Sequence, residues 1–331
     1  MTTDRTDWLV LASLTERGDR TLGDLVRSIG PAETLSRIVH DRHISTNLAQ
    51  KARTRLAALG RPSGQPLSGI AEEMLEHADR LGARIITPAD EEWPSSLDDL
   101  AGITADGNPT LRHTDPPLCM WLRGPARLDE ALQRSVSIVG ARAMTSYGQF
   151  VASEFAFGLA ERGWTVVSGG ALGVDVTAHR SALAAGGVTC AVLACGIDQP
   201  HPVSNSAVFE RIAEVGLLLT EWPPGTRPYK PRFEARNRLI AAANGTVLVE
   251  AGARSGARSA LGYARLLHRP AMVVPGPITS ALSVGCHIEL RQPRTVLVTS
   301  VEEIVEEVDG VSEPATSTRG TGRPEHADNT L

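Results

Sequence analysis

Cysteine and aromatic residues are scarce in this chain of 331 residues, and the few present show none of the spacings of a metal site or a disulfide framework. The four cysteines include no C-x-x-C pair, and the nine histidines include no H-E-x-x-H or comparable cluster. Zinc sites and disulfide-rich domains depend on such closely spaced ligands or paired cysteines. We therefore expect reduced, mostly buried thiols of a cytoplasmic protein, and neither a metal ion nor another cofactor.

Long apolar runs are also absent from the sequence. No stretch approaches the roughly 20 residues that a membrane-spanning helix needs, and Met1–Val10 is polar and charged, without the pattern of a signal peptide. The formal net charge of −5 is too small to indicate a partner by itself. These features favour a protein that has no membrane partner and is long enough for two domains.

The first sixty residues repeat apolar side chains at the 3.6-residue spacing of helices. We predict a small all-α domain of the SAM-like type over residues 1–60, which either binds nucleic acid or is a structural or partner-docking module. Glycine and proline over residues 60–69 indicate a linker, and a helix is expected from Ile70 to Gly82. The polar residues 311–331 are typical of a disordered tail.

From Ser135 onward, short β-rich runs alternate with helical stretches. This alternation predicts an α/β fold with a doubly wound, mainly parallel sheet that is covered by helices on both faces, within a second domain over residues 61–310. The expected strands are Val136–Val139, Thr165–Val167, Thr189–Ala194, Leu217–Thr220, Thr246–Glu250 and Ala271–Val274. The expected helices are Tyr147–Arg162, Val174–Ala185, Ser204–Val215, Phe233–Ala243 and Ala257–His268.

One stretch, Thr165–Asp175, has the layout of a phosphate-binding turn. A strand ends at Val167, small residues follow, and a helix begins near Val174. Glycine lets a backbone approach an anion, and a helix N-terminus favours negative charge. A tight strand-to-helix turn that binds nothing is the equal alternative. Because Ser168 takes the first glycine position of the dinucleotide fingerprint, the turn argues against NAD.

Glycine-rich turns follow each of the six expected strands. Right-handed crossovers bring these turns to one edge of a parallel sheet, where ligands of open α/β sheets bind. The turns are Gly140–Arg142, Ser168–Gly170, Gly196, Gly225, Gly252–Gly256 and Pro275–Gly276. Their convergence predicts a binding site at that edge.

Positive charge gathers in the same region. Nine Arg or Lys residues stand against three acids between Glu221 and Pro270, so this window carries +6 and the remaining chain −11. Such asymmetry favours a polyanion. The basic residues beside the turns are Arg142, Lys230, Arg236, Arg238 and Arg254, whereas Arg265 and Arg269 are interpreted as a solvated helix face. Phe233 either stacks on a base of a single strand or belongs to the core.

The order of these motifs resembles the DNA-processing protein A family, also called DprA or Smf, over about residues 93–298. The matching segments are Ser137-Ile-Val-Gly-Ala-Arg142, Val167-Ser-Gly-Gly-Ala-Leu-Gly-Val-Asp175, Thr220-Glu-Trp-Pro-Pro224, Phe233-Glu-Ala-Arg-Asn-Arg-Leu-Ile240 and Val274-Pro-Gly276. The resemblance implies an extended Rossmann-like fold and no catalysis. It also implies binding of single-stranded DNA, loading of the RecA recombinase in natural transformation, and self-association as a homodimer.

The residues that these motifs and turns nominate for DNA binding are Arg142, Ser168, Gly169, Gly170, Lys230, Phe233, Arg236, Asn237, Arg238, Ser255 and Gly256. The chain departs from the family pattern at Glu234, which replaces a proline, and over Ser255–Leu261, which lacks a threonine. Two other classes of function stay open. One is a nucleotide phosphoribohydrolase, for which Glu250 or Asp175 would be the acid, and the other is a nucleotide-sensing module that does not bind DNA.

Overall fold

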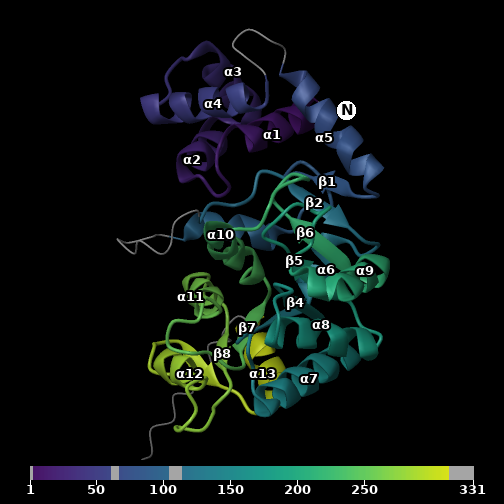
Figure 1. The fold of residues 1–331 in the computed structure, drawn as a ribbon. Helices are drawn as coiled ribbons and strands as arrows, with labels where there is room; N and C mark the ends of the chain where they lie inside the picture. The colour runs from purple at the N-terminus through teal and green to yellow at the C-terminus, as the bar shows by residue number, and fades with distance from the viewer. Residues whose placement is uncertain (1–2, 61–66, 104–113, 313–331) are drawn as a thin grey trace, which may run out of the picture.

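The structure, a computed structural model, describes residues 3–60, 67–103 and 114–312 (Figure 1). Five helices gather at one end of the molecule. They are α1 (Thr3–Leu14), α2 (Arg20–Ile29), α3 (Pro31–His40), α4 (Thr46–Ala58) and α5 (Ser68–Arg80). Local signals start three of them, because the Asp19 carboxylate caps α2, the Ser45 hydroxyl caps α4, and Pro31 opens α3.

Helix α5 lies beyond the predicted domain boundary at residue 60, yet it packs against α1 among the N-terminal helices. It begins at Ser68, inside the predicted linker, of which residues 61–66 lie outside the described residues. The apolar cluster under these helices continues to Trp121 in the sheet. The N-terminal helices therefore share an apolar cluster with the sheet. The boundaries between the predicted domains stay a prediction.

A nine-stranded sheet follows in the described part of the chain, in the order β1-β2-β6-β5-β4-β3-β7-β8-β9. The strands are β1 (Arg84–Ile86), β2 (Met120–Arg123), β3 (Ser135–Val139), β4 (Thr165–Ser168), β5 (Thr189–Val192), β6 (Leu217–Thr220), β7 (Gly245–Leu248), β8 (Ala271–Val273) and β9 (Thr295–Leu297). Strands β3 to β9 pair in parallel, while β1 and β2 add an antiparallel edge. All six expected strands form, and the predicted fold class is confirmed.

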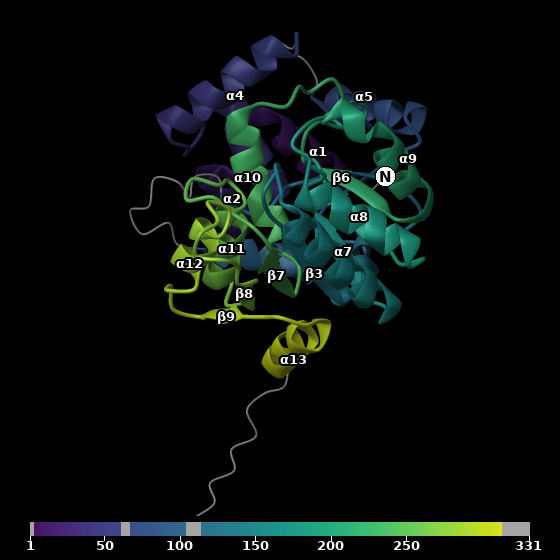
Figure 2. The same ribbon diagram turned by 60° about the horizontal axis from the view of Figure 1, so that its bottom comes forward.

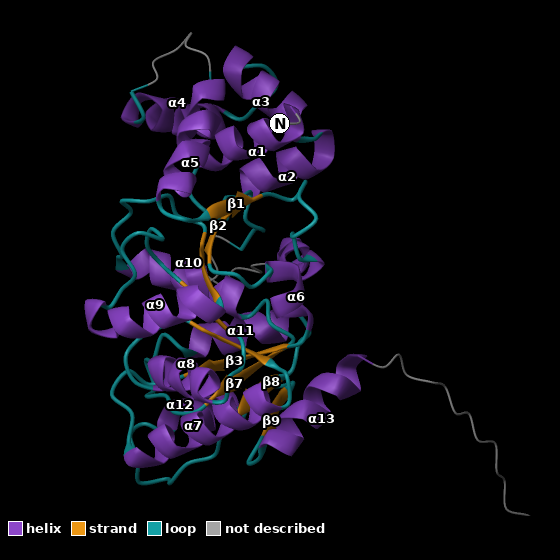
Figure 3. Ribbon diagram, turned by 90° about the vertical axis from the view of Figure 1, so that its right-hand side faces the viewer, coloured by secondary structure: helices purple, strands orange, loops and turns teal. Residues whose placement is uncertain are grey.

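Helices cover both faces of the sheet (Figures 2 and 3). On one face lie α7 (Ser146–Glu161), α8 (Val174–Ala184) and α9 (Ser206–Val215), with α13 (Val301–Ser312) beside α7. On the other face lie α6 (Leu128–Gln133), α10 (Lys230–Ile240), α11 (Arg258–Leu266) and α12 (Val284–Glu289), with the 3₁₀ segment η1 (Ser95–Gly102). A second 3₁₀ turn, η2 (Val203–Asn205), precedes α9. The strand order reverses at β3, which has β4 on one side and β7 on the other.

The structure changes the expected start of the C-terminal tail. The predicted disordered tail begins at residue 311, but α13 continues through Ser312, and residues 313–331 lie outside the described residues. The four cysteines are buried and free, as expected. None of the helices in the described ranges combines the length and the apolar character that crossing a bilayer requires.

Candidate nucleic-acid interface

A pocket of about 830 Å³ opens where the strand order reverses, at the carboxyl ends of β3 and β7. Most of its walls come from the turn after β3, helix α10, and the turn between β7 and α11, and Ala171 and Asp175 at the start of α8 also line it. Seven of the eleven predicted residues line it: Arg142, Lys230, Phe233, Arg236, Asn237, Ser255 and Gly256. The pocket thus lies at the edge where ligands of open α/β sheets bind.

Fewer of the glycine-rich turns meet at the pocket than the sequence predicts. The turns after β3 and β7 line the pocket, but Gly196, Gly225 and Pro275–Gly276 are not among its lining residues. Apolar side chains that the motif analysis did not nominate also line it: Val139, Ile240, Ala260 and Leu282. Two of them could have been found from their positions in the sequence, because Val139 is the last residue of β3 and Ile240 is the last residue of α10.

Phe233 lies between two arginines on the pocket wall. Its ring centroid is 5.5 Å from the Arg142 guanidinium carbon and 6.0 Å from that of Arg236, within the range of cation–π attraction. The His201 ring meets it edge-on at 6.3 Å. Phe233 is half-buried and belongs to none of the three apolar clusters among the described residues. This position suits a ring that stacks on a ligand better than it suits a core residue.

Arg236 is only 4% exposed, yet it lines the pocket. Its Nη1 donates to the carbonyl oxygens of Gly169, at 2.8 Å, and of Val192. Burial lowers the pKa of Arg236 to about 10, so the guanidinium stays charged at neutral pH. Among the described residues, no carboxylate oxygen lies within 4 Å of it. The charge of Asp175, which lines the same pocket, raises the pKa of Arg236 against the effect of burial.

Asn237 ties α10 to the turn that precedes α11. Its Nδ2 donates to the Gly256 carbonyl at 3.2 Å and to the Ser259 hydroxyl at 2.7 Å. Helix α11 has no side-chain cap at its first turn, and the exposed Arg254 lies beside it in the same pocket. The first amides of α11 donate to carbonyl oxygens of the preceding turn, those of Arg258 and Ser259 to Ser255 and Gly256 at 3.3 and 3.2 Å. Asn237 thus fixes the start of α11 at the pocket wall.

The small residues Ser168, Gly169 and Gly170, at the end of β4 and directly after it, are not among the lining residues of the pocket. The Ser168 hydroxyl is buried and donates to the Ile138 carbonyl at 2.6 Å. A Cβ added at Gly169 would lie 2.5 Å from Arg236 Nη1, and one added at Gly170 would lie 2.5 Å from the Phe209 ring. These glycines therefore make room for the protein's own side chains, which corrects the expectation of an anion-binding turn.

The carboxylate of Asp175 occupies that turn instead. The amide of Ala171 donates to its Oδ2 at 3.3 Å, and the amides of Gly140 and Gly169 also donate to the carboxylate. Burial raises the pKa of Asp175, while the charge of Arg236 and the three amides act in the opposite direction. The Asp175 side chain thus occupies the position at the start of α8 where the sequence predicted a bound anion.

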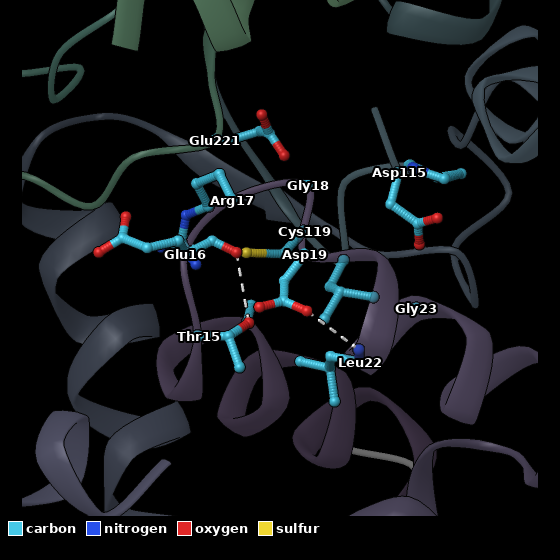
Figure 4. Close-up of a pocket in the computed structure, with 13 residues that line it drawn as sticks. Thr15, Glu16, Arg17, Gly18, Asp19, Leu22, Gly23, Asp115, Cys119 and Glu221 are labelled. Carbon is cyan, nitrogen blue, oxygen red and sulfur yellow. Dashed lines mark hydrogen bonds between the residues drawn. The ribbon is translucent and has the colours of Figure 1, made fainter. Parts of the chain in front are cut away.

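Arg238 lies on the other side of α10 and is fully buried, so its place corrects the prediction that it faces the site. Its two terminal nitrogens donate to the two oxygens of Glu221, each at 2.7 Å, and its Nε donates to the Asp115 carbonyl at 3.0 Å. Figure 4 shows Asp115 and Glu221 at a small pocket beside the turn between α1 and α2. Arg27 of α2 holds the Asp115 carboxylate at 2.7 and 2.9 Å. Arg238 is therefore part of the contact with the N-terminal helices.

The basic window is less exposed than its net charge implies. Arg258 and Arg265 share Glu289, each at 2.7 Å. Arg269 is 12% exposed and meets Asp99 at 2.8 Å. The interpretation of Arg265 and Arg269 as a solvated helix face is thus wrong, because acids from outside the window pair with them. The cations on the pocket wall are Arg142, Lys230, Arg236 and Arg254.

The model of the family described as DNA recombination-mediator protein A matches residues 84–309. The chain belongs to this family. A relative from Mycobacterium tuberculosis is 44% identical over 309 residues, covering 93% of this chain and 76% of that protein. The DNA processing protein DprA of Streptococcus pneumoniae is 36% identical over 196 residues, covering 59% of this chain and 68% of that protein. The family resemblance in the sequence motifs is confirmed.

Solved structures of family members have the same architecture. The crystal structure of DprA from Streptococcus pneumoniae aligns with a TM-score of 0.69 at 26% identity, covering 91% of this chain and 95% of that one. DNA processing protein A from Helicobacter pylori aligns with a TM-score of 0.56 at 27% identity, covering 69% of this chain and 96% of that one. The latter structure is described as giving insight into the single-stranded DNA binding mode of the Helicobacter pylori protein.

Proposed function

We propose that this protein binds single-stranded DNA without base-sequence preference, in the pocket where the strand order reverses. The observation that carries the proposal is the Phe233 ring held between Arg142 and Arg236 on the pocket wall. An aromatic ring accepts any base by stacking, and arginines pair with phosphates. Membership of a DNA-processing family supports the same conclusion.

The phosphates of the strand lie along the exposed cations of the wall. Arg142 and Arg254 come from the two turns on either side of the pocket. The apolar floor, formed in part by Val139 and Ile240, keeps water from the bases. Phosphate contacts of this kind hold a strand without reading its sequence.

The protein acts as a binder, not as an enzyme. A hydrolase of nucleotides needs an acid that is free to reach the substrate. The two acids that the sequence nominated for such a role are bound elsewhere, Asp175 to backbone amides and Glu250 to Thr145. Loading of the RecA recombinase onto the bound strand, assembly as a homodimer and a cytoplasmic location complete the proposal, and only the family resemblance and the composition support them.

Fluorescence anisotropy with labelled oligonucleotides tests this function. We expect similar affinity for oligonucleotides of different base composition and a steep loss of affinity between low and moderate salt, because bound phosphates release counterions. AMP serves as a competitor and as a trial substrate. A flat salt response, or release of free base from AMP that Glu250→Gln abolishes, would contradict the proposal.

A further inference from the structure

Helix α8 starts at the pocket, which Asp175 lines, and α7 starts three residues after the lining residue Ala143; each has one of the chain's own carboxylates at its N-terminus. Asp175 lies in the first turn of α8, and Glu250 follows β7 and reaches the first turn of α7. Both side chains are almost fully buried, at 5% and 3% exposure. Helix N-termini at this edge of an α/β sheet are where the phosphates of nucleotides bind.

At α8 the backbone leaves no room for a second anion. The amides of Gly140, Gly169 and Ala171 point at the Asp175 carboxylate. The amide of Val174 is used too, since it donates to the Ala141 carbonyl at 3.2 Å. Gly173 adopts a φ of +78°, and a Cβ there would lie 2.2 Å from the Ala141 oxygen. The turn is closed around the carboxylate that it holds.

At α7 the arrangement is built from different residues. Glu250 Oε1 accepts from the Thr145 hydroxyl at 2.6 Å, and its Oε2 accepts from the Thr145 amide at 2.9 Å. A Cβ added at Gly148 would lie 2.2 Å from Oε2, so this glycine makes space for the carboxylate against the helix. The first turn of α7 is thereby covered as well.

A carboxylate carries the charge and the hydrogen-bond acceptors of a phosphate, and its attachment to the chain gives it a high effective concentration. An incoming phosphate would have to displace this anion and then remain near it, which like charges disfavour. Helix α11 starts at the same pocket with no acidic residue in its first turn, so no carboxylate there opposes a phosphate, although its first amides already donate to backbone carbonyls.

We propose that Asp175, which lines the pocket, is a specificity-determining residue that excludes the phosphate of a free nucleotide, and that Glu250, outside the lining, closes the neighbouring start of α7 in the same way. A mononucleotide then finds no open N-terminus at either helix. A single strand does not depend on these N-termini, because it binds through Phe233, Arg142 and Arg254 at several points along its length. This inference deepens the proposed function and rests on it for the part that concerns DNA.

The test uses Asp175→Ser in the full chain, a change that replaces the carboxylate by a shorter, uncharged hydroxyl. Binding of AMP and of inorganic phosphate is measured by titration calorimetry, and competition with a labelled oligonucleotide locates it in the pocket. We expect affinity for AMP to rise about tenfold over the wild type, through loss of one nearby like charge. Glu250→Ser makes the same test at α7.

Glu234→Gln is the matched control. Glu234 lines the same pocket and is exposed, but it lies at neither helix N-terminus. Its removal should raise affinity for AMP and oligonucleotide by similar small factors. Thermal melting and gel filtration identify the variants that fold. A folded Asp175 or Glu250 variant that gains no more affinity for AMP than Glu234→Gln would overturn the inference.

The wild type provides a measurement that does not depend on the folding of any variant. Tight binding of AMP by the wild-type pocket, in competition with the oligonucleotide, would also refute the exclusion of nucleotides. Failure of the wild type to bind the oligonucleotide would instead refute the proposed function. In that case the calorimetric comparison of AMP and phosphate binding still decides whether the two carboxylates fill anion sites.

Discussion

Helix α10 carries two arginines that belong to two different regions of the molecule. Arg236 lines the pocket and donates to backbone carbonyls, with no carboxylate within 4 Å among the described residues. Arg238 faces the N-terminal helices, and its two terminal nitrogens donate hydrogen bonds to the two carboxylate oxygens of Glu221. Both side chains are buried. The difference shows that the partner, and not burial or residue type, separates an arginine that is available to a ligand from one that holds the fold.

At the contact between the N-terminal helices and the sheet domain, each of the two main arginines forms an ion pair with a carboxylate. Arg27 meets Asp115, and Arg238 meets Glu221. A buried pair of this kind gains little over an apolar pair, but removal of one partner leaves an uncompensated charge. Among the described residues, the pocket arginines form no ion pair within 4 Å, although the charge of Asp175 acts on Arg236. Substitutions should therefore reduce stability in the first region and DNA binding in the second.

The largest effect is expected from Arg238→Ala. Glu221 would remain buried without its partner, so the free energy of unfolding should fall by about 3–5 kcal/mol. Urea unfolding followed by circular dichroism measures this loss. The double variant Arg238→Met with Glu221→Leu removes both charges and should recover much of it. Unchanged stability together with weakened DNA binding would move Arg238 into the interface and break the comparison.

The next effect concerns His179, a buried group behind the pocket. Burial lowers its pKa to about 3, and the charge of Arg236 contributes in the same direction. Because the folded pKa is below the value of about 6.5 in the unfolded chain, its contribution to stability is present above pH 6.5 and is lost as the pH falls towards 3. Between pH 7 and pH 5 this amounts to about 2 kcal/mol.

Urea unfolding of the wild type and of His179→Gln at both pH values isolates this contribution. The wild type should lose the extra stability at pH 5, and the variant should not. This measurement sharpens the comparison between the two regions. His179, whose pKa the charge of Arg236 helps to lower, is buried as a neutral group, whereas the contact with the N-terminal helices buries charged groups in ion pairs. An equal loss in both proteins would show that His179 does not stay neutral in the fold.

Phe233→Ala should weaken binding of an oligonucleotide by roughly 1–3 kcal/mol, the range of base–aromatic stacking. The salt dependence should hardly change, because stacking releases no counterions. Anisotropy titrations at several salt concentrations measure both quantities, with Phe233→Trp as the variant that keeps a stacking ring. If Phe233 is instead a core residue, its removal would cost roughly 3–5 kcal/mol of stability. A large drop in melting temperature with unchanged affinity would then follow.

The smallest effect is expected from Arg142→Ala. Affinity should fall by about 1 kcal/mol for every base composition, and the salt slope should decrease by about 0.7, the value for one phosphate of a single strand. The matched control is Arg180→Ala, an exposed arginine on α8 that does not line the pocket. Equal effects of the two substitutions would indicate attraction by general charge and would remove Arg142 from the site.

Much of the fold was predictable because its signals are local. Apolar β-branched runs and helical spacing predicted all six central strands, and the glycine turns predicted the edge that carries the pocket. The helices α6, α12 and α13 and the strand β9 were missed. Three of them, α6, α12 and β9, have only three to six residues and give a short periodic pattern.

The errors at the site have a common physical cause. Arg236 and Arg238 were both nominated from one motif, yet side chains two residues apart on a helix do not share a face. That spacing was the available signal that one of them points away from the pocket. No local signal could show that Glu289 and Asp99 neutralise Arg265 and Arg269, since these acids are separated from them by 24 and 170 positions.

The sequence by itself determined the family, the alternation of strands and helices, and the edge of the sheet where the pocket lies, because motif order, hydrophobic period and glycine turns are written along the chain. The tertiary structure decided which charges are free. Asp175 and Glu250 fill the starts of two helices, and Glu221 takes Arg238 away from the pocket. These partners meet only after folding, because electrostatic pairing depends on distance in space and not on separation along the chain.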